Sequence, residues 1–396
     1  MVELTSTTPL KRLFPPGGDR RGPEWLLLVG VSWESRNLPS YDAEAGPGRI
    51  DGPASRGRAT GSVSKKKQTV GYSVIIPVKE INHYLRESVP RLLAMDYSEF
   101  EVIILPNDMP AGNLPECFAD PRVRVVATGR VSPAVKRDIG AQQAIHGRLA
   151  FLDDDAYPRS DWLREADAAF TASGAAAVGG PGVTPPDSSL AERASALFFE
   201  SRLGGGGMAY RYRPVGRGFD VDDFPTVNLL VEKSAFDAVG GFDNEFWPGE
   251  DTKFCLDLKR AGCRIWYAPD VVVYHHRRRV LRPHLKQVGG YGKHRGYFAR
   301  TLPETSLRLT YFVPSLFLLG SIALIALGFA ANLFWKIYLG MMLVYLMMVA
   351  VDVFSLTTNP VLGVLTVLTI YASHLTYGLM FLRGLLVRSS LRSTLR

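Results

Sequence analysis

Three adjacent carboxylates are the feature of this 396-residue chain that most directly suggests chemistry. Asp153, Asp154 and Asp155 follow the apolar run 148–152, which is typical of a buried strand. In open α/β sheets the ligand crevice lies at the carboxyl ends of strands, and carboxylates crowded there repel one another unless a cation lies among them. Mg²⁺ and Mn²⁺ prefer hard oxygen ligands and often share them with substrate phosphates. The triplet therefore favours a divalent metal that holds a diphosphate, with a solvated strand end or a helix N-cap as the alternative.

The elements that would position these carboxylates alternate along the first half of the domain. Apolar or β-branched runs predict strands at 72–78, 101–105, 123–127, 148–153 and 175–180. The periodic segments between them predict helices at 85–93, 133–147 and 161–172. This alternation predicts an α/β fold with a doubly wound, mainly parallel, Rossmann-like sheet. Because Asp153 and Asp155 flank one residue, their side chains can point to the same side of a strand end.

The second half of the domain, up to residue 280, has a less regular pattern. Helices are predicted at 190–203, 233–239 and 250–260, and strands at 225–231 and 271–274. Four consecutive glycines, Gly204–Gly207, should not hold regular structure. They predict a hinge or lid, with a plain surface loop as the alternative.

Composition divides the rest of the chain. Residues 1–70 are rich in Gly, Pro, Arg and Ser and predict a flexible N-terminal segment. Residues 281–306 mix aromatic and basic residues, which suits an amphipathic helix in a membrane interface; an ordinary surface helix is the alternative. Residues 307–387 are almost continuously apolar and predict a transmembrane region rather than a buried soluble helical domain, and 388–396 form a basic tail.

The number of spans stays open between two and three. Tyr311–Leu333, Ile337–Leu356 and Val361–Leu382 are each near the length that crosses a bilayer. Three spans would place the C-terminus opposite the globular domain, whereas the arginines at the end of the chain favour the cytoplasmic side: Arg383, Arg388, Arg392 and Arg396. Either one segment does not cross the membrane, or the charge rule is overridden here.

The formal net charge of +8 has to be considered together with the predicted membrane region. A basic excess in such a chain indicates contact with anionic headgroups and anchoring of the cytoplasmic side. Nucleic acid is not expected as a partner, because the globular part shows no basic stripe with interleaved aromatic residues. We therefore expect a multi-pass protein of the cell (inner) membrane, with the globular domain in the cytoplasm and membrane lipids among its partners.

Five motifs occur together between residues 72 and 280. They are the strand and loop Ser73–Glu80, the basic helix start Lys136–Gly140, the carboxylate run Leu152–Asp155, Asn228 followed by Val239–Asp243, and the acid pair Glu250 and Asp251. In this combination the chain resembles the family 2 glycosyltransferases, which have the GT-A fold. With its C-terminal spans it resembles the membrane enzymes of that family that build polysaccharides or glycolipids.

The resemblance implies a donor site and a metal site. Asp155, Asp153 and His275 would bind Mg²⁺ or Mn²⁺. The residues implied to bind a UDP- or GDP-linked sugar are Pro77, Val78, Glu80, Asn107, Asp108, Lys136, Arg137, Asp153 and Asp154. Lys136 and Arg137 would stand near the phosphates, with solvated helix charges as the alternative. The family usually has two acids where this chain has Asn107 and Asp108, a pair that is also typical of a turn, so the donor base stays open.

The resemblance also implies an acceptor site. Transfer to a hydroxyl needs a base that takes the proton, and Asp251 is the candidate, with Glu250 orienting the acceptor or sharing the task. A carboxylate at a helix start is stabilised as an anion, which predicts a weaker base than a buried one. The alternative is that both acids only cap the helix. Thr226, Asn228 and Trp247 are predicted to contact the acceptor.

Basic and aromatic residues after the last predicted strand suit phosphate or lipid headgroups. These predicted contacts are His276, Arg277, Arg279, Tyr291, His294 and Arg295, and Arg278 lies among them. Imidazole donates well to phosphate when it is protonated, although His275 and His276 would equally serve as structural residues.

The function expected from these features is that of a membrane-anchored, inverting glycosyltransferase. It would move a sugar from a nucleotide-diphosphate donor to a lipid-linked, polyprenyl-type acceptor or to a glycan hydroxyl. Two alternatives stay open, which are a polyprenyl-phosphate glycosyltransferase and a non-catalytic membrane scaffold that binds nucleotide sugars.

Overall fold

The computed structural model describes residues 70–112, 114–246 and 249–388. Its strands are β1 (Tyr72–Pro77), β2 (Phe100–Leu105), β3 (Val123–Val125), β4 (Arg148–Leu152), β5 (Ala156–Pro158), β6 (Ala177–Gly179), β7 (Gly182–Val183), β8 (Phe219–Asp220), β9 (Asn228–Glu232), β10 (Ile265–Tyr267) and β11 (Val273–His275). Its longer helices are α1 (His83–Leu93), α2 (Pro133–Gln143), α3 (Trp162–Ser173), α4 (Leu190–Glu200), α6 (Lys233–Val239), α7 (Glu250–Arg260), α8 (Arg282–Thr301), α10 (Leu309–Gly328), α11 (Asn332–Phe354) and α12 (Pro360–Leu386). Short helical turns are η2 (Glu116–Ala119), α5 (Arg202–Gly205), η3 (Ala209–Arg211), η4 (Asn244–Phe246) and α9 (Pro303–Ser306).

The central sheet has the order β3-β2-β1-β4-β9-β6-β10-β8. Its first four strands are parallel, and so is the pair β6 and β10. β9 runs antiparallel to both of its neighbours, β4 and β6. The predicted α/β fold with a mainly parallel sheet is confirmed, whereas the insertion of an antiparallel strand beside β4 was not predicted.

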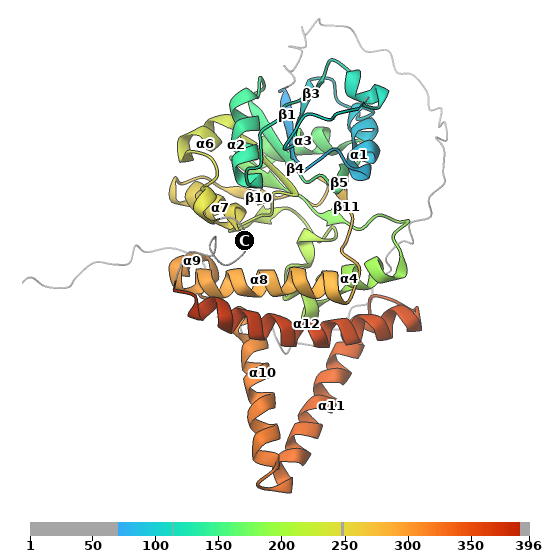
Figure 1. Cartoon of the computed structure of the whole chain (residues 1–396), viewed down its shortest axis with the longest axis vertical. Helices are drawn as coiled ribbons and strands as arrows, with labels where there is room; N and C mark the ends of the chain where they lie inside the picture. The colour runs from blue at the N-terminus through green and yellow to red at the C-terminus, as the bar shows by residue number, and fades with distance from the viewer. Residues whose placement is uncertain (1–69, 113, 247–248, 389–396) are drawn as a thin grey trace, which may run out of the picture. The chain divides into compact units, whose positions relative to one another are not determined.

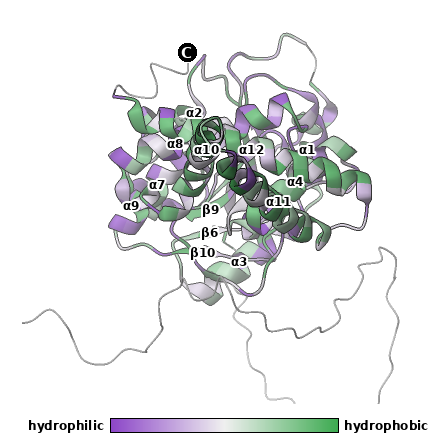
Figure 2. Ribbon diagram, turned by 90° about the horizontal axis from the view of Figure 1, so that it is seen from below, coloured by the Kyte–Doolittle hydropathy of each residue, from purple (hydrophilic) through white to green (hydrophobic). Residues whose placement is uncertain are grey.

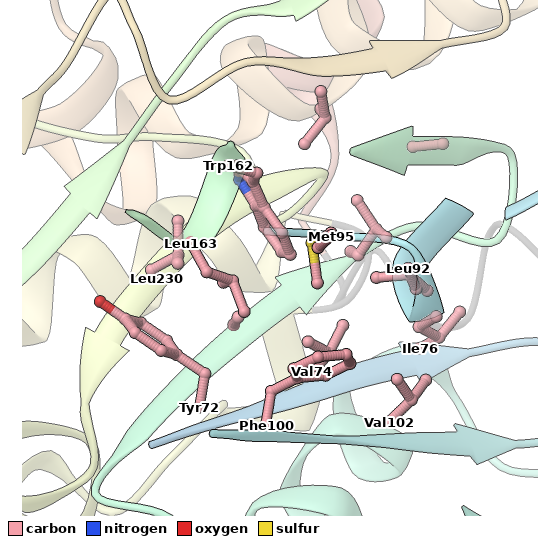
Figure 3. Packing of buried hydrophobic residues seen from close by; sticks show 14 of the residues in the cluster. Tyr72, Val74, Ile76, Leu92, Met95, Phe100, Val102, Trp162, Leu163 and Leu230 are labelled. Atoms are coloured by element: carbon pink, nitrogen blue, oxygen red, sulfur yellow. The ribbon is translucent and has the colours of Figure 1, made fainter. Parts of the chain in front are cut away.

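Helices cover both faces of this sheet because alternate strand residues point to opposite sides. Val74 and Ile76 of β1 pack with residues of α1 and α3, while Ile75 packs with residues of α2, α6 and α7. Figure 3 shows the first of these cores, in which Trp162 and Leu163 lie over the strand residues. The two buried cores fix the carboxyl ends of β1, β2 and β4 at one edge of the sheet.

A second, three-stranded sheet has the order β5-β11-β7. β5 begins directly after the carboxylate run, and it pairs antiparallel with β11 so that His275 lies opposite Ala156. The His276 backbone N–H donates to the Asp155 carbonyl at 3.0 Å. This register brings His275 from the far end of the domain to the carboxylates, where the family resemblance implied a metal ligand, whereas the strand pairing itself was not predicted.

The glycine-rich segment departs from the expectation. Arg202–Gly205 forms the helical turn α5, with the Ser201 hydroxyl accepting the Gly204 N–H at 3.0 Å. Among the four glycines of this run, only Gly206 and Gly207 have positive φ, at 61° and 86°. The prediction that the whole run lacks regular structure was therefore wrong, because packing against α4 and a local cap hold its first two glycines.

Helices α10, α11 and α12 are each long and apolar enough to cross a membrane, and Figure 2 shows hydrophobic residues along them. The predicted first span ran too far, since α10 ends at Gly328 and α11 begins at Asn332. α8, predicted as an interfacial helix, packs along α12 (Figure 1). Glycines permit this contact, because a Cβ at Gly296 would lie 2.1 Å from the Phe381 carbonyl oxygen and one at Gly384 would lie 2.0 Å from the Lys293 carbonyl oxygen.

Candidate active site

The predicted metal ligands come together at the junction of the two sheets. One ligand atom each from Asp153, Asp155 and His275 lies within 4.8 Å of the others. Asp155 is 6% exposed, and its carboxylate lies 3.1 Å from His275 Nε2 and 3.2 Å from Arg278 Nη2. Burial alone would raise the pKa of Asp155, but His275 and Arg278 overcome it and lower that pKa to about 2. The carboxylate is therefore ionised at every physiological pH.

This donor set fits a hard divalent cation. Two carboxylates and an imidazole suit Mn²⁺ somewhat better than Mg²⁺, which favours oxygen ligands throughout. Arg277 Nη1 lies 3.0 Å from His275 Nδ1, and because arginine only donates, Nε2 carries the imidazole hydrogen that faces Asp155. Ligation through Nε2 requires the loss of that hydrogen and the release of Nδ1 by Arg277. The two aspartates therefore form the permanent part of the site.

A buried arginine connects the metal carboxylates to the acid pair. Arg137, from α2, is 4% exposed and donates to Asp153 at 2.9 Å and to Glu250 at 2.8 Å. Its Nε has no hydrogen-bond partner within the described residues. One buried N–H thus remains for a ligand oxygen beside the carboxylates, consistent with the predicted place of Arg137 near the phosphates.

Asp154 has a different environment from its two neighbours. Its carboxylate accepts a hydrogen bond from the Asn82 amide, the N-cap residue of α1. Burial, together with the charges of Asp155 and Asp153, raises the pKa of Asp154 to about 6. This side chain also lines the cavity at the end of β1, which suits contact with a donor rather than with the metal.

Glu250 and Asp251 are distinguished by their partners. Glu250 is paired with Arg137, whereas Asp251 accepts only a 2.7 Å hydrogen bond from its neighbour, the Thr252 N–H, among the described residues. Burial raises the pKa of Asp251 to about 6, with further contributions from the negative charges of Glu250 and Asp223. The expectation of a weak base at a helix start is corrected, since burial and neighbouring acids outweigh the helix.

Most of the predicted donor residues surround a cavity of about 950 Å³ at the ends of β1 and β2, whereas Arg137 and Asp153 line a neighbouring cavity. Its lining includes Pro77, Val78, Glu80, Asn107, Asp108, Lys136 and Asp154. Lys136 is 3% exposed, and its ammonium donates to the carbonyls of Val78 and Leu105 and to the side chain of Asn107. All three of its protons are thereby used. Lys136 therefore holds the two strand ends together and does not extend to a phosphate. This differs from the prediction that Lys136 stands near the phosphates.

A second cavity of about 550 Å³ adjoins the first and shares Pro77, Pro133 and Asp154 with it. It is lined by all three carboxylates of the run, by Glu250 and Asp251, and by Thr226, Arg277, Tyr291, His294 and Arg295. Tyr311 of α10 and Tyr377 of α12 also line it. The candidate metal ligands and the acid pair therefore face one cavity, which continues to the apolar helices.

A buried ion network lies in the wall of this second cavity. Asp223 lies between two arginines, with the Arg295 guanidinium 2.8 Å away and that of Arg211 in direct contact. Burial would raise the pKa of Asp223, but the two arginines hold it well below its usual value. Neither Asp223 nor Arg211 was singled out from the sequence, because no motif connects the residues of this network.

Three of the predicted contacts lie away from the cavity. Asn228 is fully buried in the sheet, where its amide accepts from Trp162 Nε1 at 2.9 Å and donates to the Val271 carbonyl at 2.7 Å. His276 pairs with Glu87 at 2.9 Å and packs against Tyr84, and the exposed Arg279 does not line the cavity. Asn228 and His276 therefore support the fold, which corrects the prediction of acceptor and phosphate contacts. Trp247 lies outside the described residues.

Over residues 149–381 the sequence matches the family described as glycosyl transferase family group 2, and the matched residues are more than half of the chain. The chain belongs to glycosyl transferase family group 2. The fold agrees with this assignment: the structure has a TM-score of 0.54 to the mannosyltransferase PcManGT from Pyrobaculum calidifontis, solved with GDP-Man and Mn²⁺. That likeness covers 82% of this chain and 89% of the other, at 16% sequence identity, and shows the fold alone.

Curated relatives of this family 2 chain are matched over shorter segments. A pre-mycofactocin glycosyltransferase of Mycobacterium tuberculosis is 31% identical over 161 residues, which are 40% of this chain and 33% of the relative. The succinoglycan biosynthesis protein ExoA of Rhizobium meliloti is 34% identical over 104 residues, which are 26% of this chain and 30% of the relative. Glycosyltransferase AglE of Haloferax volcanii is 25% identical over 211 residues, 51% of this chain and 66% of the relative. The matches thus span about a third of the first two relatives.

Proposed function

We propose that the protein is a metal-dependent, inverting glycosyltransferase that moves a sugar from a UDP- or GDP-linked donor to a hydroxyl of a lipid-linked acceptor. The observation that carries this proposal is Asp251, which forms no ion pair among the described residues and whose raised pKa suits a base, in the same cavity as the candidate metal ligands. A scaffold that only binds nucleotide sugars has no need for a base with a raised pKa.

The two cavities divide the donor between them in this proposal. The nucleoside occupies the cavity at the ends of β1 and β2, and the sugar extends past Asp154 into the second cavity. Asp153, Asp155 and His275 would hold Mg²⁺ or Mn²⁺, which offsets charge on the departing diphosphate. The free Nε–H of Arg137 supplies a further donor to a diphosphate oxygen beside them.

The chemical step follows from the position of Asp251. An acceptor hydroxyl enters from the cavity wall opposite the nucleoside, and Asp251 removes its proton as the oxygen attacks the anomeric carbon. A single displacement inverts that centre. Glu250 stays paired with Arg137, so its charge positions the arginine and does not compete for the proton.

The class of acceptor is inferred from what lines the membrane-side end of the cavity. Tyr291, Tyr311 and Tyr377 come from α8, α10 and α12, and of these α10 and α12 are apolar enough to cross a membrane. A lipid-linked acceptor would place its headgroup among these polar ends and its chain along the helices. A polyprenyl-phosphate acceptor is already an anion and would not need Asp251, so the raised pKa favours a hydroxyl.

We further propose that only α10 and α11 cross the membrane. Both ends of α12 contact elements of the catalytic side, since Leu362 packs with Ala194 and Val280 and the Val387 carbonyl accepts from Arg300. α10 begins and α11 ends against α12, whereas the turn that joins them lies away from it (Figure 1). Two crossings return the basic C-terminus to the side of the catalytic domain, the cytoplasmic face of the cell membrane.

The activity is tested with purified protein in nanodiscs and a panel of UDP-, GDP- and dTDP-sugars. Nucleotide diphosphate release is followed with and without Mn²⁺ or Mg²⁺, beside Asp155→Ala and the exposed control Asp237→Ala. Metal-dependent release from one donor, lost only in Asp155→Ala, is expected. Donor binding without release, even with polyprenyl-linked acceptors, would favour the scaffold.

The topology is tested with a protease-sensitive tag at the C-terminus in inside-out and right-side-out vesicles. Two crossings predict that the tag and the catalytic domain are cleaved from the same side. Cleavage from opposite sides would establish three crossings.

A further inference from the structure

The backbone of one residue next to the glycine-rich segment is held by side chains from two of the apolar helices. The Leu203 N–H donates to Asp352 Oδ2 of α11 at 2.8 Å. The Leu203 carbonyl accepts from His374 Nε2 of α12 at 2.9 Å. Helices from the C-terminal region thus hold both polar groups of one residue in the catalytic domain.

The hydrogen-bond pattern determines the state of this histidine. Because the Leu203 carbonyl can only accept, His374 Nε2 must carry a hydrogen. The Nδ1 atom of the neutral ring is then an acceptor, and the Tyr345 hydroxyl lies 2.9 Å from it. Tyr345, His374 and Leu203 form one chain of directed hydrogen bonds, in which each donor has its acceptor.

The segment held in this way forms part of the wall of the second cavity, which is the acceptor cavity of the proposed function. Gly204, Gly205 and Met208 line the cavity beside Asp251 and Tyr291. A Cβ at Gly204 would lie 2.3 Å from the Phe198 carbonyl oxygen, so this wall fits tightly on the end of α4. The four-residue turn α5 is far too short to be stable alone. Its position depends on contacts from outside, which are the Ser201 cap and the two side chains that hold Leu203.

We propose that Asp352 and His374 are positioning residues for acceptor binding. They fix the Leu203–Met208 wall so that the cavity has the shape that the acceptor requires. A carboxylate on a helix that borders the membrane is costly unless it has a function, and here its partner is a peptide N–H of the cavity wall. This role rests on the proposed glycosyltransferase function, because it assigns the wall to the acceptor.

The experiment compares substitutions that keep or remove each hydrogen bond at similar size. Asp352→Asn keeps an oxygen that accepts the Leu203 N–H, whereas Asp352→Leu removes it. His374→Gln keeps an N–H donor, whereas His374→Phe removes it. Tyr345→Phe retains the ring but loses the outer hydrogen bond, so it should have the smallest effect.

The first measurement is hydrogen–deuterium exchange of the peptide that spans residues 201–208, in nanodiscs. Faster exchange is expected in Asp352→Leu and in His374→Phe, with wild-type protection in the Asn and Gln variants. Exchange that is unchanged in both apolar variants would show that Asp352 and His374 do not hold this segment, whatever the activity of the protein.

The second measurement is transfer, with the KM of donor and acceptor determined separately. The apolar variants should raise the acceptor KM about tenfold, as expected for one lost hydrogen bond to a charged or buried group, and leave the donor KM and kcat near wild type. Because both side chains hold one residue, the double variant should resemble each single variant rather than their product. Faster exchange with an unchanged acceptor KM would overturn the positioning role, and a wild-type protein without any transfer would instead refute the proposed function.

Discussion

The donor cavity and the acceptor cavity are built in different ways. The donor cavity lies at the ends of neighbouring parallel strands, and its lining comes from the segments that follow β1, β2 and β4 and from side chains of α1 and α2. The acceptor cavity is lined by long charged and aromatic side chains from α4, α7, α8, α10 and α12. Its charged side chains form ion pairs, as Asp223 does with both Arg211 and Arg295.

The difference shows which half of the reaction each region can control. A site on strand ends is rigid, because two buried cores fix the strands from both faces. A site between helices depends on ion pairs and on packing against elements distant in sequence. In the proposed function, the nucleoside of the donor would bind at the rigid edge. The acceptor would bind where changes of helix packing can alter the shape of the cavity.

The largest expected effect separates the two carboxylates at the start of α7. Asp251→Asn should lower kcat by about 10³-fold, within the range of general-base removal, and leave donor binding near wild type. Glu250→Gln should instead weaken donor binding, since it releases Arg137 beside the metal carboxylates. Steady-state kinetics and donor titration distinguish these results. Equal loss of kcat in both variants would mean that the pair acts as one unit.

The rigidity of the donor cavity is tested at Lys136. Lys136→Met removes three hydrogen bonds that join the ends of β1 and β2. We expect the donor KM to rise about tenfold and the free energy of unfolding to fall by about 1–3 kcal/mol, with the acceptor KM unchanged. Lys259→Met, on the exposed face of α7, is the control. A selective rise in the acceptor KM would break the separation of the two cavities.

The elements around the donor cavity follow from the sequence because the patterns that specify them are local. The strand at 148–152, the helix start at 133 and the carboxylate run follow from short patterns, and the structure places them at one sheet edge. The acceptor region was predicted less well. Asp223 and Arg211 are partners only through the fold, and Asn228 was assigned to the acceptor although its amide joins Trp162 to the Val271 carbonyl. The antiparallel β9 and the register that brings His275 to Asp155 are likewise long-range pairings.

The pH dependence of transfer tests the environment of Asp251. Its pKa of about 6 predicts that kcat is constant above pH 7 and falls tenfold per pH unit below about pH 5, where the base is protonated. Donor binding through the ionised Asp155, whose pKa is about 2, should not follow this curve. Rate profiles and donor titrations across pH 4.5–8 would be compared. A rate that stays level down to about pH 5 would remove Asp251 from the role of base.

The stability of the fold should respond in the opposite sense. The folded pKa of Asp251 lies near 6 against an ordinary value of 3.8, so the folded state retains a proton between these pH values that the unfolded state has lost. Stability therefore falls as pH rises through this window. Asp251→Asn should be more stable than wild type at pH 7.5, by about 1–3 kcal/mol, and the difference should vanish near pH 4. Thermal unfolding in detergent with EDTA measures this difference in stability. A variant that is less stable than wild type at pH 7.5 would contradict the raised pKa of Asp251.

The smallest expected effect concerns the ion network behind the base. Asp223 contributes to the raised pKa of Asp251, and it forms ion pairs with Arg211 and Arg295. Asp223→Asn removes a negative charge and exposes two positive ones, and both changes favour the ionised form of Asp251. The midpoint of the kcat profile should therefore move below pH 6, whereas the donor KM should not change. Asp223→Asn leaves the two arginines without their partner. The double variant Asp223→Asn/Arg211→Met also removes one of these positive charges, so it should bring the midpoint of the kcat profile back toward wild type. A midpoint that stays in place in both variants would show that the acceptor wall does not tune the base, and that the network only supports the packing of α8 against the catalytic domain.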